Sequence, residues 1–476
     1  MSSSGCWKCL SRPNTSQFLQ TSHATLRLPN TAAAAAAGFS TSAVLGKDPV
    51  KAKPKGASTF AQKQARTGKT LIIKKRPPPV KTGKPPADGE RKALRKRIVL
   101  SNTNALTVEG LEDLGLNNIG SEGLVTKVMG LSGSTVDSLR ASEAFKVTQA
   151  WNLFRRPAVL VREESLRCTK VLEEAEEEKK TERLVIDGGR VSGKSMMLLH
   201  AMASAFVKGW IVLHIADTQE LVNACTEYAP IPDTTPTLFS QPTYTAAWLE
   251  RIGKANEAVL DKLQLSQEHN LPIDIPENTT LLRLCQLGTR EPEHSWPIFQ
   301  AFWKEITAAD RPPILMSLDG LQWIMKDSLY RNADFSLIHA HDLTVINHFV
   351  QYLSGEKTLP NGGAVIAATS RSHAPISRST DLAIMQQINR QAEEEITERD
   401  PFEKKYDERA DKALQGVKVL WLNGLSKREA RSLMEYWAQS GLLRQRVDEK
   451  IVTEKWALAG NGIVGELERG SLRMRI

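Results

Sequence analysis

The chain has 476 residues, with 63 Lys and Arg against 54 Asp and Glu, which gives a formal net charge of +9. An apolar fraction of 41% and a charged fraction of 25% are ordinary for a globular protein, and the length suggests two or three domains. No run approaches the roughly 18 apolar residues of a membrane-spanning helix, and five cysteines are too few for a disulfide scaffold. The composition therefore excludes a membrane-spanning protein and favours a reducing compartment.

The charge is divided unevenly along the chain. Residues 1–98 carry a net charge of +17, whereas the remaining residues carry −8. Residues 1–46 contain no acidic residue and 13 Ser and Thr, a composition typical of a mitochondrial presequence. Residues 47–98 contain 17 Lys and Arg and seven prolines, so we expect a disordered basic arm that contacts RNA phosphates. The alternative for residues 1–46 is a disordered tail of accidental composition. The alternative for residues 47–98 is a solvated linker.

Residues 99–183 are predicted to form an N-terminal helical and irregular region. Turn-rich stretches precede a helix predicted over residues 141–154, which Pro157 would end. The heavily charged residues 161–183 are typical of a solvated helix face without a site.

The decisive motif is a glycine-rich turn between a predicted strand and a predicted helix. The apolar run Leu184–Asp187 precedes a full match to G-x-x-x-x-G-K-[ST], and residues 196–203 are strong helix formers. Backbone N–H groups of such a turn surround phosphate oxygens, and the helix adds its positive N-terminus. Lys194 would reach the terminal phosphates and the Ser195 hydroxyl would bind Mg²⁺. The predicted nucleotide-binding residues are Gly188, Gly189, Arg190, Val191, Ser192, Gly193, Lys194, Ser195 and Met196.

A second Mg²⁺ ligand is expected at the end of another strand, and Asp319 ends the apolar run 312–319. Further strands are predicted over residues 210–215 and 363–370, the latter ending in hydroxyls suited to sensing a γ-phosphate or a water. The alternation of strands and helices predicts a doubly wound α/β domain of the P-loop NTPase type, similar to AAA+ and STAND proteins, over residues 184–416.

The residue after Asp319 argues against rapid hydrolysis. In AAA+ and STAND ATPases that position usually holds a Glu that orients the attacking water, but here it is Gly320. We therefore predict no catalytic residue and a nucleotide that is retained with little or no hydrolysis. Because the chain has no N-K-x-D signature, GTP, GDP and ATP all stay open as the ligand.

Residues 417–476 predict a helical lid subdomain. A helix is expected over residues 426–439, with Ser426 as N-cap and Glu429 at the third position. The G-x-G-x-x-G run at 460–465 has too little chain after it for a dinucleotide fold, and the start of a lid helix at 460–461 suits it better. Residues 339–342 offer too few metal ligands, and Asp342 is expected to cap a helix over 343–353.

Three segments resemble the death-associated-protein-three family. They are the run Leu184–Ser195, the strand 210–215 with Asp217 after it, and the strand end at Asp319 and Gly320. Members of this family are P-loop proteins of the mitochondrial small ribosomal subunit, and the resemblance covers roughly residues 140–476.

The resemblance implies a structural role in the ribosome of the mitochondrial matrix. Expected partners are small-subunit ribosomal RNA, ribosomal proteins and the large subunit, and the expected ligand is a guanine or adenine nucleotide. Carried over to this chain, the family pattern assigns Gly188, Gly193, Lys194 and Ser195 to phosphate and Mg²⁺, and Asp319 to Mg²⁺.

Two other functions are considered. An active matrix NTPase for assembly or signalling is disfavoured by Gly320. A helicase-loader ATPase is also disfavoured. That class usually carries a winged-helix domain after its lid, and no such segment is expected after the predicted lid over residues 417–476.

Overall fold

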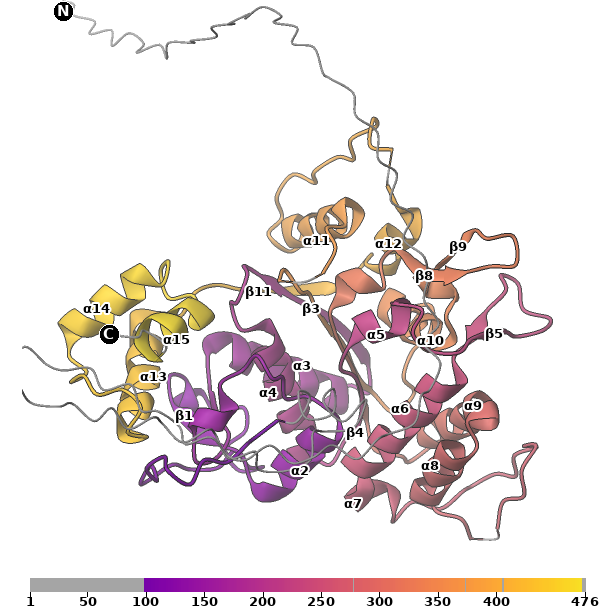
Figure 1. The fold of residues 1–476 in the computed structure, drawn as a ribbon, viewed down its shortest axis with the longest axis horizontal. Coiled ribbons are helices and arrows are strands. Elements are labelled where there is room, and N and C mark those ends of the chain that lie inside the picture. Colours follow the sequence, from indigo (N-terminus) through magenta and orange to yellow (C-terminus); the bar gives the residue numbers. More distant parts are fainter. Residues whose placement is uncertain (1–97, 277, 373, 405, 473–476) are drawn as a thin grey trace, which may run out of the picture. The chain divides into compact units, whose positions relative to one another are not determined.

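The computed structural model describes residues 98–276, 278–372, 374–404 and 406–472 (Figure 1). The predicted presequence and residues 47–97 of the predicted basic arm lie outside this part of the chain. Among the described residues, no helix is both long enough and apolar enough to cross a membrane.

A parallel sheet of five strands forms the centre of the fold. In spatial order its strands are β11 (Lys418–Leu422), β3 (Thr181–Gly188), β10 (Gly363–Ala368), β7 (Ile314–Asp319) and β4 (Ile211–Ile215). All neighbouring pairs are parallel, so their carboxyl ends meet at one edge. The predicted α/β class and four predicted strands are confirmed, whereas β11 is a strand that the sequence analysis did not predict.

Helices cover both faces of this sheet, because successive residues of each strand enter different apolar clusters. In β10, for example, Ile366 packs with one cluster and Val365 with the other. The face of the sheet toward which Ile366 points is covered by α2 (Gly133–Ala141), α3 (Glu163–Glu177) and α4 (Lys194–Val207). The opposite face is covered by α6 (Pro242–Ala255), α8 (Leu281–Arg290), α9 (Ser295–Ile306) and α10 (Thr344–Ser354).

Further elements, most of them short, lie between these strands and helices in the chain. They are η1 (Glu122–Leu124), β1 (Val128–Gly130), η2 (Trp151–Leu153), β2 (Ala158–Leu160), α5 (Thr218–Val222), β5 (Ala229–Pro230), β6 (Phe239–Ser240), α7 (Glu257–Leu260), η3 (Pro292–His294), η4 (Leu321–Trp323), β8 (Asp327–Arg331), β9 (Leu337–His339), η5 (Ala340–Asp342), α11 (Arg378–Gln391) and α12 (Glu408–Ala413).

The C-terminal helices α13 (Lys427–Gln439), α14 (Glu449–Leu458) and α15 (Val464–Leu472) pack around an apolar cluster of their own (Figure 1). The Ser426–Glu429 capping box at the start of α13 is confirmed. The last helix begins at Val464 and not at residues 460–461. Residues 460, 461 and 462 have φ values of 66°, 63° and 83°, so this segment is a left-handed turn.

The predicted helix over residues 141–154 is wrong. Helix α2 ends at Ala141, and Glu143 has a φ of 59°, which a continuing right-handed helix does not allow. After this break the chain turns Phe145 inward, where its ring packs edge-on against Trp151 with a centroid distance of 5.0 Å. The burial of this aromatic pair is a tertiary effect that the local pattern did not reveal.

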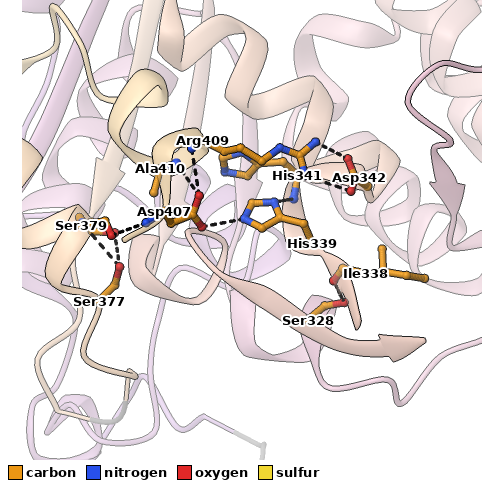
Figure 2. A network of polar contacts seen from close by, with 11 residues as sticks. Ser328, Ile338, His339, His341, Asp342, Ser377, Ser379, Asp407, Arg409 and Ala410 are labelled. Carbon is orange, nitrogen blue, oxygen red and sulfur yellow. Dashed lines mark hydrogen bonds and ion pairs between the residues drawn. The ribbon is translucent and has the colours of Figure 1, made fainter. Parts of the chain in front are cut away.

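The prediction that Asp342 caps helix α10 is also wrong. The N-cap is Leu343, and the Asp342 carboxylate forms two hydrogen bonds of 2.6 and 3.0 Å with the Arg409 guanidinium. Figure 2 shows the neighbouring contact between His339 Nε2 and Asp407 Oδ2, which measures 2.9 Å. Burial raises the pKa of Asp407, but the hydrogen bond and charge of His339, together with the backbone N–H groups of Ala410 and Arg409, outweigh it and the net pKa is lowered. These contacts attach the β8–β9 hairpin to α12.

We predict that Ile366→Ala lowers the free energy of unfolding by about 2 to 5 kcal/mol, because it leaves a cavity in the central strand. Urea unfolding of the purified chain, followed by circular dichroism, measures this loss. Leu329→Ala is the control, since Leu329 is 61% exposed and its truncation should change the value by no more than about 0.5 kcal/mol. Equal losses in both variants would contradict the assignment of the core.

Candidate functional site

The glycine-rich turn (Gly188–Ser195) joins the end of β3 to the start of α4. Gly193 is the N-cap of α4 and has a φ of 99°, a conformation that favours glycine. At Gly188 a Cβ atom would lie 2.6 Å from the carbonyl oxygen of Leu422 on the neighbouring strand β11. The turn therefore needs glycine at both positions, one for backbone conformation and one for close strand packing.

Lys194 lies folded against the turn. Its Nζ donates hydrogen bonds to the carbonyl oxygens of Gly188 at 2.8 Å and Gly189 at 2.6 Å. Because the residue is buried, the pKa of its ammonium is lowered to about 8. Lys194 is thus still mostly protonated at neutral pH, and the site contains a positive charge that is only partly neutralised.

An ion pair with a buried carboxylate lies directly before the turn. The Asp187 carboxylate accepts hydrogen bonds from Arg371 Nη2 at 2.7 Å, Arg371 Nε at 3.2 Å and Thr369 Oγ1 at 2.5 Å. Burial raises the pKa of Asp187, but these donors outweigh it and the net pKa is lowered. Neither charged residue is marked in the sequence, because Asp187 looks like the end of a strand and Arg371 belongs to no motif.

Asp319 lies at the same edge of the sheet, at the end of β7. Strand β10 separates β7 from β3, so the parallel topology brings the turn and Asp319 to one side. Thr218 Oγ1 donates to the carbonyl oxygens of Asp319 at 3.0 Å and Gly320 at 2.8 Å, which holds this strand end. The Asp319 carboxylate itself forms an ion pair with Lys146, a residue that the sequence analysis did not identify.

The glycine-rich turn and Asp319 border a common cleft of about 1110 Å³. Residues 190–195 of the turn and Met196 of α4 form part of its wall, and Asp319, Lys146 and Arg371 also line it. Gly188 does not line the cleft, and Gly189 instead borders a second cavity of about 610 Å³. The structure therefore brings most of the predicted binding residues together with the predicted metal ligand Asp319.

Helix α15 closes the cleft on another side. The Gly465 backbone N–H donates to the Val191 carbonyl at 3.0 Å, which connects the C-terminal helices to the glycine-rich turn. A Cβ atom at position 465 would lie 2.7 Å from Val191 Cβ. The last glycine of the G-x-G-x-x-G run is therefore explained by this close approach.

The residues of the cleft suit Mg²⁺ only together with phosphate. The Ser195 hydroxyl and the Asp319 carboxylate both border it, and Mg²⁺ is often held by one or two such oxygens plus phosphates and waters. Within the described ranges, no group of three or more His, Cys, Asp or Glu could hold a metal without such help. The buried hydroxyl of Ser192, also on the cleft, makes no hydrogen bond and is free to contact a ligand.

Comparisons with known proteins identify the family. Residues 159–470 match the family described as mitochondrial ribosomal death-associated protein 3. The chain belongs to this family. Small ribosomal subunit protein mS29 of Neurospora crassa is 47% identical over 99% of both chains. The Schizosaccharomyces pombe protein of the same name is 26% identical over 64% of this chain and 62% of the relative. The Mus musculus protein of that name is 20% identical over 40% of this chain and 49% of the relative.

Family membership confirms the resemblance that the motifs indicated. The matched residues include the glycine-rich turn, Asp319 and most of α15. Family membership also confirms the mitochondrial location that the sequence predicted, since the family is one of mitochondrial ribosomal proteins.

We predict that Arg371→Met destabilises the fold by about 2 to 3 kcal/mol, because it leaves the buried Asp187 carboxylate without its charged partner. This value is below that of a fully buried pair, since the Arg371 side chain is 35% exposed. Urea unfolding of the single variant and of Arg371→Met/Asp187→Asn measures the effect. The double variant should recover part of the loss, and no difference between wild type and the single variant would show that the pair does not stabilise the fold.

Proposed function

We propose that this chain is a structural protein of the mitochondrial small ribosomal subunit that retains a purine nucleotide with Mg²⁺. The observation that carries the ribosomal role is the 47% identity, over 99% of both chains, to a relative named as a small ribosomal subunit protein. Small-subunit ribosomal RNA and its proteins are the proposed partners. Contacts to the large subunit belong to the same proposal.

The nucleotide would occupy the cleft as in a P-loop protein. Backbone N–H groups of the glycine-rich turn and the N-terminus of α4 would bind the phosphates, and Lys194 would add its charge. The Ser195 hydroxyl and the Asp319 carboxylate would hold Mg²⁺, which when bound neutralises phosphate charge. GTP, GDP and ATP are all compatible with these contacts, since each supplies the same phosphates.

Retention without rapid hydrolysis follows from the end of β7. Gly320 has no side chain that could take a proton from an attacking water. Its φ of 96° also keeps the backbone in a conformation that disfavours a replacement by Glu at this position. The chain's own residues would therefore bind and enclose the nucleotide, and the nucleotide would stabilise the junction between the sheet and α15.

The ribosomal role predicts co-sedimentation. In a salt-washed mitochondrial lysate, this chain should stay with the small ribosomal particle on a sucrose gradient, detected with an antibody. Recovery only at the top of the gradient, with intact small particles further down, would contradict the role.

For the nucleotide site, we predict that Lys194→Ala weakens binding of GDP or ADP by at least tenfold, since a charge-assisted contact to phosphate contributes about 1.5 kcal/mol or more. Calorimetric titration of the purified full chain measures this. Lys208→Ala, at the other end of α4, is the matched control and should bind as wild type does. Multiple turnovers per minute that Lys194→Ala abolishes would overturn retention without hydrolysis.

The lowered pKa of Lys194 predicts a pH dependence of nucleotide binding. Phosphate binds the protonated ammonium, whose pKa in the free protein is about 8, so affinity should be lost as pH rises through that value. Between about pH 7 and about pH 9.5 the affinity should fall roughly tenfold or more. Titrations across this range test the effect, and a flat profile in wild type, matching that of Lys194→Ala, would contradict it.

A further inference from the structure

The cleft contains a second lysine whose position the proposed nucleotide site does not explain. Lys146 Nζ forms an ion pair with Oδ2 of Asp319, the carboxylate proposed as a Mg²⁺ ligand. The Asp319 side chain is only 3% exposed, whereas the Lys146 side chain is 35% exposed and reaches it from the cleft. An ammonium group therefore neutralises the carboxylate that the metal would use.

The backbone around Lys146 is held in place by neighbouring contacts. The Lys146 N–H donates to Gln149 Oε1 at 2.9 Å, and the Gln149 N–H donates back to the Lys146 carbonyl at 3.0 Å. Gln149 Oε1 also accepts from the Trp151 indole at 2.5 Å, and the buried Phe145 ring packs on that indole. The segment that carries Lys146 is therefore anchored, so the ion pair is part of the fold and not a chance contact of a loose surface chain.

A buried carboxylate without a counter-charge is costly, so Asp319 needs a cation. Lys194 is the other lysine near the carboxylate, but its Nζ is engaged by the carbonyl oxygens of Gly188 and Gly189. A Mg²⁺ ion at the proposed site would therefore have to share Asp319 with Lys146 or displace it. Repulsion between a bare Asp319 and a phosphate would be strong in this partly enclosed cleft, where charges are poorly screened.

We propose that Lys146 is an internal counter-ion for Asp319, which lets the cleft hold a nucleotide without Mg²⁺ and which Mg²⁺ must displace. This inference rests on the proposed nucleotide site and deepens it, because it names how metal dependence is set. It follows that the wild-type protein binds nucleotide with weak dependence on Mg²⁺. A chain without this lysine depends on Mg²⁺ strongly.

The first test measures GDP and ADP binding to the full chain by calorimetry, in EDTA and then in increasing MgCl₂. In EDTA, Lys146→Met should lose about tenfold or more in affinity, because Asp319 then repels the phosphates. Added MgCl₂ should restore binding, with a half-maximal concentration several-fold below that of wild type. Lys146→Arg keeps the charge and should behave as wild type does, as should Lys127→Met, which removes the same charge from an exposed position.

The second test uses Mg²⁺ alone, without nucleotide, and measures the melting temperature. Lys146→Met should melt below wild type in EDTA, because its buried carboxylate is unpaired, and millimolar MgCl₂ should raise its melting temperature more than that of wild type. The double variant Lys146→Met/Asp319→Asn should lose this larger response, since it has no carboxylate for the metal.

The outcomes separate the two proposals. If Lys146→Met binds nucleotide in EDTA as wild type does and responds to MgCl₂ no more than wild type, the counter-ion role is wrong while the nucleotide site stands. If wild type binds neither nucleotide under any condition, the nucleotide site is wrong, and the Mg²⁺ response of the melting temperature alone then decides whether Lys146 and the metal compete for Asp319.

Discussion

Charge compensation at the carboxyl edge of the sheet is the constraint on which the rest of this structure depends. Parallel strands bring two buried carboxylates, Asp187 and Asp319, to that edge, and neither can stay ionised there without a cation. Arg371 neutralises the first and Lys146 the second. Because both partners come from segments outside the sheet and line the cleft, the cleft is complete only when those segments are folded against the strand ends.

The same edge connects the sheet to the C-terminal helices. The glycine-rich turn follows Asp187 directly, and α15 reaches back to it through the hydrogen bond between Gly465 and Val191. A phosphate ligand at this junction would contact the turn and lie close to α15, so its binding energy would hold the two parts together. For a structural ribosomal protein this offers a physical reason for the proposed retention of a nucleotide, since the ligand would act as a part of the fold and would not need to be turned over.

The signals that led from sequence to site were local. The turn residues, the apolar strands and the capping box of α13 each depend on a few neighbouring positions, so their patterns were readable. Asp319 was found for the same reason, because it ends an apolar run. The helix predicted over residues 141–154 failed because Glu143 has a positive φ and Phe145 packs into an apolar cluster that includes residues of α4 and the sheet, which a local pattern does not show.

By itself, the amino-acid sequence determined the fold class, the family and the position of the turn, since strand periodicity and a contiguous motif survive without tertiary contacts. Only the folded chain decided that β11 joins the sheet, that Arg371 neutralises Asp187 and that Lys146 meets Asp319. These pairs join residues separated by more than 170 positions, and no local pattern marks Arg371 or Lys146 as the partner of its carboxylate. The topology of the sheet decides which residues can pair, because it sets which strand ends lie near one another at the carboxyl edge.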